Sequence, residues 1–209
     1  MNLKILKKII LFFLLALFIN NALFSQDLDN KWVVGVGVNV VDIRNSGSIS
    51  ETFKDYFNGD LNDLNMSGAF IKVFAERYLD KGFSLQLSLS ANKIEKGYYY
   101  KQGDDLSNDN FAAVDAKFKY DLNHILGETK WFDPFLLLGG GYVKIGDNSN
   151  ANIASGFGFN AWITDNFGLN FQSDYNHGIK SFGTDYFQHS AGLIFKLNSN
   201  PNFIWRGKN

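Results

Sequence analysis

The chain of 209 residues contains no cysteine and only two prolines. The absence of cysteine excludes disulfide scaffolds, thiolate metal sites and cysteine nucleophiles. A formal charge of −1 gives no electrostatic reason to expect nucleic acid as a partner. Helix-favouring runs of Ala, Glu, Leu and Lys are missing beyond the first twenty residues, whereas Phe (21), Tyr (9) and Gly (20) are abundant. This balance favours β structure that is held together by packing and backbone pairing.

The N-terminal segment has the features of an export signal. Three lysines precede the apolar run 9–19, and Ser25 supplies a small residue for cleavage. The run is too short for a spanning helix, which needs roughly 20 apolar residues. We therefore predict a signal peptide over residues 1–25. Its removal takes away three lysines and no acidic residue, so that a charge of about −4 remains.

Two-residue hydrophobic periodicity predicts eight strands of at least 10 residues. Strands in soluble proteins average about 5 to 6 residues, whereas tilted membrane-spanning strands need about 9 to 11. The predicted strands are Trp32–Ile43, Gly68–Tyr78, Gly82–Ile94, Phe111–Asp121, Phe132–Lys144, Asn152–Ile163, Phe167–Asn176 and Tyr186–Leu197. The interior of a bilayer offers no hydrogen-bond partners to the backbone groups at an open sheet edge, so strands that span a membrane must form a closed barrel. The predicted fold class is all-β, an eight-stranded antiparallel up-and-down transmembrane β-barrel over residues 26–198, with a short periplasmic tail over 199–209.

The predicted strands sort their side chains into an apolar face and a polar face. In 82–94, phenylalanine and leucine alternate with serine, glutamine and asparagine, whereas the register of 132–144 is ambiguous. A soluble barrel turns its apolar face inward, and a membrane barrel turns it toward lipid. Mid-strand charges fall on the polar face, so we predict an interior ion-pair network that offsets the cost of desolvation. Its expected members are Lys72, Glu76, Asp115, Lys117, Lys119 and Asp174, with Lys196 nearer one end.

The links between the predicted strands alternate between short and long. Long polar links, 44–67 and 95–110, follow the first and third strands, and shorter links, 145–151 and 177–185, follow the fifth and seventh. Bacterial outer-membrane barrels have short periplasmic turns and longer extracellular loops, so this order predicts periplasmic termini. Aromatic residues gather at both ends of the strands and predict two interfacial girdles. The girdle residues are expected to be Trp32, Tyr78, Phe83, Phe111, Tyr120, Trp131, Phe132, Tyr142, Trp162, Phe167, Tyr175 and Tyr186.

The second long link contains Tyr98, Tyr99 and Tyr100, followed by Asp104 and Asp105. We interpret this stretch first as a polar surface loop. Its second interpretation is a contact site for an extracellular or surface protein or a glycan, because tyrosines beside carboxylates suit both partners.

Glycine and aromatic patterns recur along the chain, with WVVGVGVN at 32–39, AERYL at 75–79, GGGY at 139–142 and FQHSAG at 187–192. In these stretches the chain resembles the OmpA-like outer-membrane β-barrel family, in particular the eight-stranded barrels of Bacteroidetes. The resemblance implies a barrel in the Gram-negative outer membrane that is surrounded by outer-membrane lipid. Many members continue into a peptidoglycan-binding domain, which we do not expect here because little sequence follows the last strand.

Besides a structural role, three classes of function need an argument from the residues: an enzyme, a pore and a soluble carrier. His189 and Ser190 form the candidate serine–histidine pair, but adjacent strand residues point to opposite faces, so we predict no catalytic residue. The histidines lack metal-ligand spacing, and no cofactor or metal is expected. Eight strands enclose an interior that side chains just fill. The expected function is a non-enzymatic structural or surface-interaction role for a monomeric barrel; a small pore is the first alternative and a lipocalin-like soluble barrel, apolar inside, the second.

Overall fold

The structure is a computed structural model that describes residues 31–43, 64–95, 108–127, 129, 131–179 and 185–197. The elements in these ranges are β1 (Trp32–Asp42), β2 (Leu64–Asn65), β3 (Ser67–Asp80), β4 (Phe83–Ile94), β5 (Asp109–Asp121), α3 (Asn123–Leu126), β6 (Phe132–Ile145), β7 (Asn148–Trp162), β8 (Phe167–Gly178) and β9 (Tyr186–Leu197). Within the described ranges, no helix has the length and apolar character needed to cross a membrane. The predicted signal peptide, the stretch 98–105 and the tail 199–209 lie outside the described residues.

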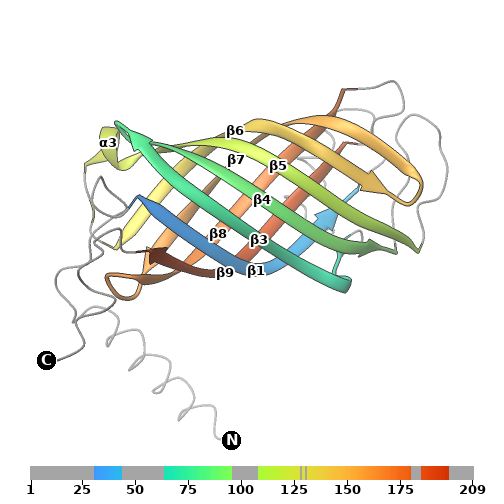
Figure 1. The fold of residues 1–209 in the computed structure, drawn as a ribbon, viewed down its shortest axis with the longest axis horizontal. Coiled ribbons are helices and arrows are strands. Elements are labelled where there is room, and N and C mark those ends of the chain that lie inside the picture. The colour runs from blue at the N-terminus through green and yellow to red at the C-terminus, as the bar shows by residue number, and fades with distance from the viewer. Residues whose placement is uncertain are drawn as a thin grey trace, which may run out of the picture.

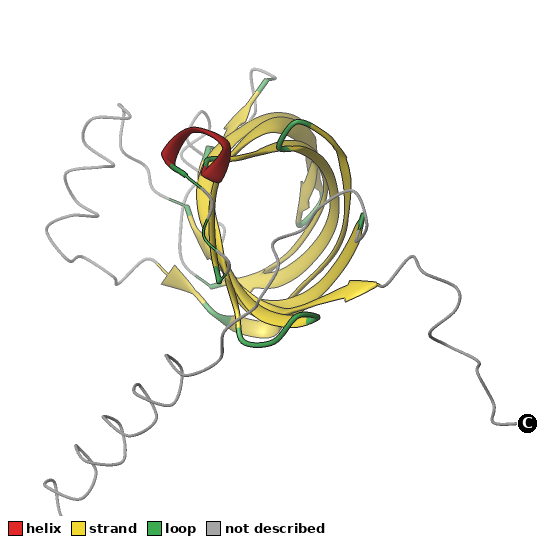
Figure 2. Ribbon diagram, turned by 90° about the vertical axis from the view of Figure 1, so that its left-hand side faces the viewer, coloured by secondary structure: helices red, strands yellow, loops and turns green. Residues whose placement is uncertain are grey.

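The strands close into a barrel (Figures 1 and 2). From β3 to β9, each strand pairs antiparallel with the next, and β1 pairs with both β3 and β9. The closing ladder runs from Trp32↔Leu197 to Asp42↔Phe187, so the two ends of the barrel wall lie side by side. Since β2 is a two-residue strand beside the end of β1, the wall itself has eight strands. The predicted eight-stranded antiparallel barrel is confirmed.

The two ends of the barrel differ in their connections. One end, here called the short-turn end, carries the turn 81–82, the link 163–166 and the segment with α3. The other end, here called the loop end, carries the links from β1 to β2, from β4 to β5 and from β8 to β9. α3 lies at the end that faces the viewer in Figure 2.

One predicted link is wrong. β7 begins at Asn148 rather than Asn152, because Ile145 pairs with Asn148 across the two residues Gly146 and Asp147. Gly146 has a φ of 57°, a left-handed conformation that glycine adopts without steric cost and that tight hairpins require. The expected link 145–151 is therefore a two-residue turn at the loop end, and the alternation of short and long links breaks there.

Side chains alternate between the outside and the inside of the barrel. The outward Leu89, Val114 and Leu138 are 55%, 58% and 63% exposed, whereas the inward Gln86 and Lys117 are each 1% exposed. Apolar groups thus face out and polar groups face in, the reverse of a soluble barrel. This is the orientation that the alternation predicted.

The expected aromatic girdles are correct only in part. Trp32, Phe83, Trp131 and Tyr142 lie on the outer surface and are 42 to 54% exposed. Three residues assigned to the girdles are instead buried inside the barrel: Phe111, Trp162 and Tyr186. The reason is their strand parity, which they share with the inward polar residues of β5, β7 and β9.

These inward aromatic residues belong to two buried apolar clusters, one toward each end of the barrel. The cluster at the loop end, here called the loop-end plug, consists of Val41, Ile43, Ile94, Phe111, Ala113, Val143, Ile145 and Tyr186. The cluster at the other end, here called the short-turn plug, consists of Val33, Phe74, Trp162 and Ile194. Neither plug was predicted, because the sequence indicated a polar interior along the whole length.

Candidate functional site

Buried charges form two ion-paired groups in the barrel interior. Lys117 of β5 places its Nζ 2.7 Å from Oδ2 of Asp174 on β8, and Lys72 of β3 places its Nζ 3.6 Å from the same oxygen. Asp115 lies 3.6 Å from the Lys117 Nζ. Asp174 therefore joins strands from opposite sides of the barrel. These four residues, here called the Asp174 cluster, comprise two cations and two anions, so their charges balance.

A second ion pair lies beside this cluster. The Nζ of Lys119 donates to both carboxylate oxygens of Glu76, at 2.8 and 2.9 Å. The same ammonium group lies 4.2 Å from the centroid of the Phe135 ring, a cation–π distance. Because Glu76 comes from β3 and Lys119 from β5, this pair also connects strands that are not neighbours in the wall.

Lys196 is placed differently from the other predicted residues. Its Nζ lies 3.9 Å from the centroid of the Trp162 ring, in the short-turn plug. Trp162 donates its indole N–H to Asp133, and the side-chain amide of Asn123 donates to the same carboxylate. Six of the seven residues thus lie in the two ion-paired groups, and Lys196 lies at the short-turn end.

Two glycines make room for the carboxylates. Gly141 pairs with Asp115 across β5 and β6, and Gly156 pairs with Asp174 across β7 and β8. A Cβ atom at Gly141 would overlap the Asp115 carboxylate, and a Cβ atom at Gly156 would overlap that of Asp174. One member of the glycine run whose register was ambiguous in the sequence, Gly141, therefore leaves the space that the Asp115 carboxylate occupies, and Gly156 on β7 does the same for Asp174.

A layer of amides lies between the Asp174 cluster and the loop-end plug. The side-chain amide of Gln188 donates to Asn39 Oδ1 and to Ser90 Oγ, both at 2.9 Å. The amide of Asn92 donates to the backbone oxygens of Asn39 and Asn65 at 2.8 and 3.0 Å, which holds β2 against the wall. The layer was not predicted as a unit, although its members occupy inward positions.

The interior combines balanced ion pairs with apolar clusters. The charges of each ion-paired group balance, and an apolar plug lies toward each end of the barrel. Both amide atoms of the buried Gln86 side chain lack a hydrogen-bond partner, as do one oxygen of Asp115 and one of Asp174. In the described part of the chain, no three His, Cys, Asp or Glu residues are grouped to hold a metal ion.

The candidate serine–histidine pair is separated as predicted, but His189 has another serine partner. Ser190 points inward, where its Oγ accepts a hydrogen bond from the Lys72 Nζ at 3.4 Å. His189 points outward, and its Nδ1 lies 3.0 Å from Oγ of Ser173, its partner in the β8–β9 ladder. Treating His189 and Ser190 as the sole candidate pair was therefore wrong. Residues 16 positions apart are brought together by strand register, which the sequence pattern does not specify.

No model of a known protein family matches the sequence, and no curated protein matches it. Among solved structures, the chain is similar to the outer membrane protein OprG from Pseudomonas aeruginosa, with 12% identity and a TM-score of 0.54 over 81% of this chain and 97% of that one. It is also similar to Neisserial surface protein A, with 12% identity and a TM-score of 0.49 over 79% of this chain and 96% of that one. The attachment invasion locus protein Ail of Yersinia pestis, solved with the heparin analogue sucrose octasulfate, gives 12% identity and a TM-score of 0.46 over 80% and 97% of the two chains. The similarity to OprG shows a shared barrel fold.

Proposed function

We propose that the chain is a non-enzymatic barrel of the Gram-negative outer membrane with a structural or surface-interaction role. One observation carries the proposal: large apolar side chains face outward, while lysines and carboxylates are buried inside. In water this arrangement would expose a continuous apolar band, which soluble monomers avoid. In a bilayer the same band contacts the hydrocarbon of the lipids, so its exposure carries no free-energy penalty.

The burial pattern opposes the lipocalin-like alternative. Such a carrier would enclose a cavity lined by apolar side chains, with charges on its surface. Here Lys72, Lys117 and Asp174 are at most 2% exposed, and their partners lie in the interior. The described residues therefore argue against a soluble binding barrel.

The plugs argue against the pore alternative. An open aqueous path would need polar lining along the whole axis, whereas Phe111 and Tyr186 at the loop end and Trp162 and Ile194 at the short-turn end are buried in apolar clusters. The ion pairs also fill the middle of the interior, as expected for a barrel of eight strands. We infer a closed interior that stabilises the wall and leaves recognition to the outside.

The remaining parts of the proposal concern topology and partners. The closing pair Trp32↔Leu197 brings the first and last strands together at the short-turn end, which supports periplasmic termini. We retain the signal peptide over 1–25, the tail over 199–209, the OmpA-like resemblance and the monomeric state as parts of this proposal. Residues 98–105, in the sequence between β4 and β5, are the proposed contact for an extracellular protein or glycan.

Fractionation and gel mobility test the membrane location. The full-length protein is expressed in a Gram-negative host, and outer and inner membranes are separated on a sucrose gradient. We expect the protein in the outer-membrane fraction, with faster migration of the unheated than of the heated sample, because a closed barrel resists detergent unfolding. A protein in the soluble fraction with no heat-dependent mobility would overturn the proposal.

Conductance in planar bilayers tests the closed interior. We expect the purified barrel to show no steady current of porin size. A deletion of residues 98–105 serves as the companion variant, because it removes the proposed contact site and leaves every described strand intact. Steady open channels in the unaltered protein would support the pore alternative instead.

A further inference from the structure

The two most exposed large apolar side chains of the described residues lie at the short-turn end, outside the strands. They are Ile125 and Leu126 of α3, which are 70% and 72% exposed. In the axial view of Figure 2, α3 lies at the rim of the barrel. The link 163–166 at the same end is different, because its residues Thr164, Asp165 and Asn166 are exposed and polar. The two links at this end thus differ in what they present to their surroundings.

α3 is fixed in its position by its first two residues. The buried side-chain amide of Asn123 donates to Oδ1 of Asp133 and to the backbone oxygen of Phe132, both at 3.0 Å. His124 packs against the turn between β3 and β4 so closely that a Cβ atom on Gly82 would overlap its imidazole ring. The exposure of the next two residues is therefore a property of a docked segment.

The backbone N–H groups of α3 are paired within its own turn. Those of Ile125 and Leu126 both donate to the backbone oxygen of Leu122 at 2.9 Å, and that of Gly127 donates to the Asn123 oxygen at 3.0 Å. Unpaired backbone donors are costly where water is scarce, and a helical turn removes that cost. The segment is therefore compatible with a layer that contains little water.

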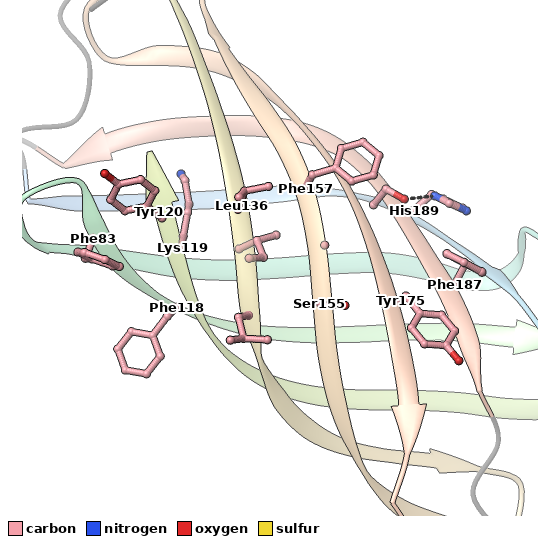
Figure 3. A pocket seen from close by; sticks show the side chains of 14 residues that line it. Phe83, Phe118, Lys119, Tyr120, Leu136, Ser155, Phe157, Tyr175, Phe187 and His189 are labelled. Atoms are coloured by element: carbon pink, nitrogen blue, oxygen red, sulfur yellow. Dashed lines mark hydrogen bonds between the residues drawn. The ribbon is translucent and has the colours of Figure 1, made fainter. Parts of the chain in front are cut away.

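Aromatic residues flank α3 on both sides in the sequence. Tyr120, near the end of β5, packs against Phe83 of β4 with the ring centroids 4.7 Å apart (Figure 3). Trp131, which follows α3 and is 54% exposed, packs against Phe132 of β6 with the centroids 5.4 Å apart. Tyrosine and tryptophan are enriched where a membrane meets water. The apolar residues of α3 therefore adjoin aromatic residues that suit the edge of the lipid-facing band.

We propose that α3 is a lipid anchor at the short-turn end of the barrel. Ile125 and Leu126 insert among the lipid headgroups, as the apolar faces of interfacial helices do to a depth of about 5 to 10 Å. A protein partner is a poorer occupant, because two side chains are far fewer than the roughly 20 to 30 residues a side that a stable interface uses. Lipid needs no matching surface, and α3 adjoins the band for which lipid contact is proposed. The inference rests on the proposed membrane location.

Single-cysteine labelling tests the anchor, since the chain contains no cysteine of its own. Ile125→Cys and, in a second variant, Leu126→Cys carry the fluorophore NBD, and the full-length protein is reconstituted in phosphatidylcholine vesicles. Two quenchers are compared: a phosphatidylcholine with a nitroxide near its glycerol backbone, and iodide present on both sides of the membrane. Asp165→Cys in the polar link at the same end is the matched control, and Leu138→Cys on the outward face of β6 is the reference inside the hydrocarbon.

We expect nitroxide quenching at positions 125 and 126 to exceed that at position 165 by about twofold or more, and iodide quenching to follow the opposite order, because an interfacial side chain lies at the level of the nitroxide. Equal quenching at positions 125, 126 and 165 would overturn the anchor. Shielding of positions 125 and 126 from both quenchers would also overturn it, because a second copy of the chain would then cover them. The label at position 138 separates the two proposals. If the nitroxide quenches it while positions 125 and 126 stay in water, only the anchor fails, and if iodide quenches it, the proposed membrane location fails.

Discussion

Replacement of Asp174 by asparagine removes the charge that joins three strands. The side chain is fully buried, with Lys117 Nζ at 2.7 Å, Lys72 Nζ at 3.6 Å and the Gln172 amide at 2.7 Å. Asp174→Asn keeps the shape but leaves two buried cations with one anion between them. Breaking a buried pair in this way costs about 3 to 5 kcal/mol of unfolding free energy, because an uncompensated charge stays in a dry interior.

Equilibrium unfolding by urea in phospholipid vesicles, followed by tryptophan fluorescence, measures this loss. Asp147→Asn in the exposed turn at the loop end is the control, with an expected change within about 0.5 kcal/mol. The double variant Asp174→Asn with Lys117→Met restores equal numbers of cations and anions in the Asp174 cluster. We expect it to be less destabilised than the sum of the single variants by about 0.5 to 3 kcal/mol. Additive effects, or a loss below about 1 kcal/mol for Asp174→Asn, would refute the reasoning.

Three further changes test the wall, the glycine packing and the plug. Leu89→Lys places a charge in the middle of the outward face of β4 and is expected to cost about 2 to 4 kcal/mol in vesicles, whereas a near-zero change in the same urea titration would indicate a water-exposed surface. Gly156→Ala pushes against the Asp174 carboxylate and the backbone oxygen of Ser173 and should cost about 1 to 3 kcal/mol; unchanged stability would mean that both the carboxylate and the β8 backbone have space to move. Phe111→Ala in the loop-end plug is expected to cost about 3 to 5 kcal/mol in the same urea titration; a loss below about 1 kcal/mol would contradict tight packing of that plug.

The strands could be predicted because lipid outside and polar packing inside impose a period of two. Features that depend on how the strands pair with one another could not be predicted from the sequence. Residues 148–150 are polar, and the sequence pattern predicted a loop over 145–151. In the structure they form the start of β7, because Asn148 pairs with Ile145 across the turn. Likewise, Phe111 is an aromatic residue near a strand end, as girdle residues are. It belongs to the loop-end plug because its position in β5 turns the side chain inward. The Ser173–His189 contact depends on the register of β8 against β9.

The charged residues themselves were predictable, because a charge inside an alternating strand has only one acceptable face. The partners of these charged residues were harder to predict. Lys119 bonds Glu76 across β4, and Asp174 reaches Lys72 across the interior, contacts that depend on barrel curvature as well as on sequence. The match of Gly141 to Asp115 and of Gly156 to Asp174 could not be predicted either, because it depends on the strand ladders.

Buried ion pairs are weak evidence for stability, since apolar side chains of similar volume often replace them at no cost. Their value in this barrel lies in specifying register. If β5 slipped by one residue against its neighbours, Asp115, Lys117 and Lys119 would turn toward lipid, and each lysine would cost about 2 to 4 kcal/mol near the midplane. An apolar interior would impose no such penalty, because both faces of the strand would then suit lipid. The Asp174 cluster thus excludes the slipped barrel whether or not it stabilises the correct one.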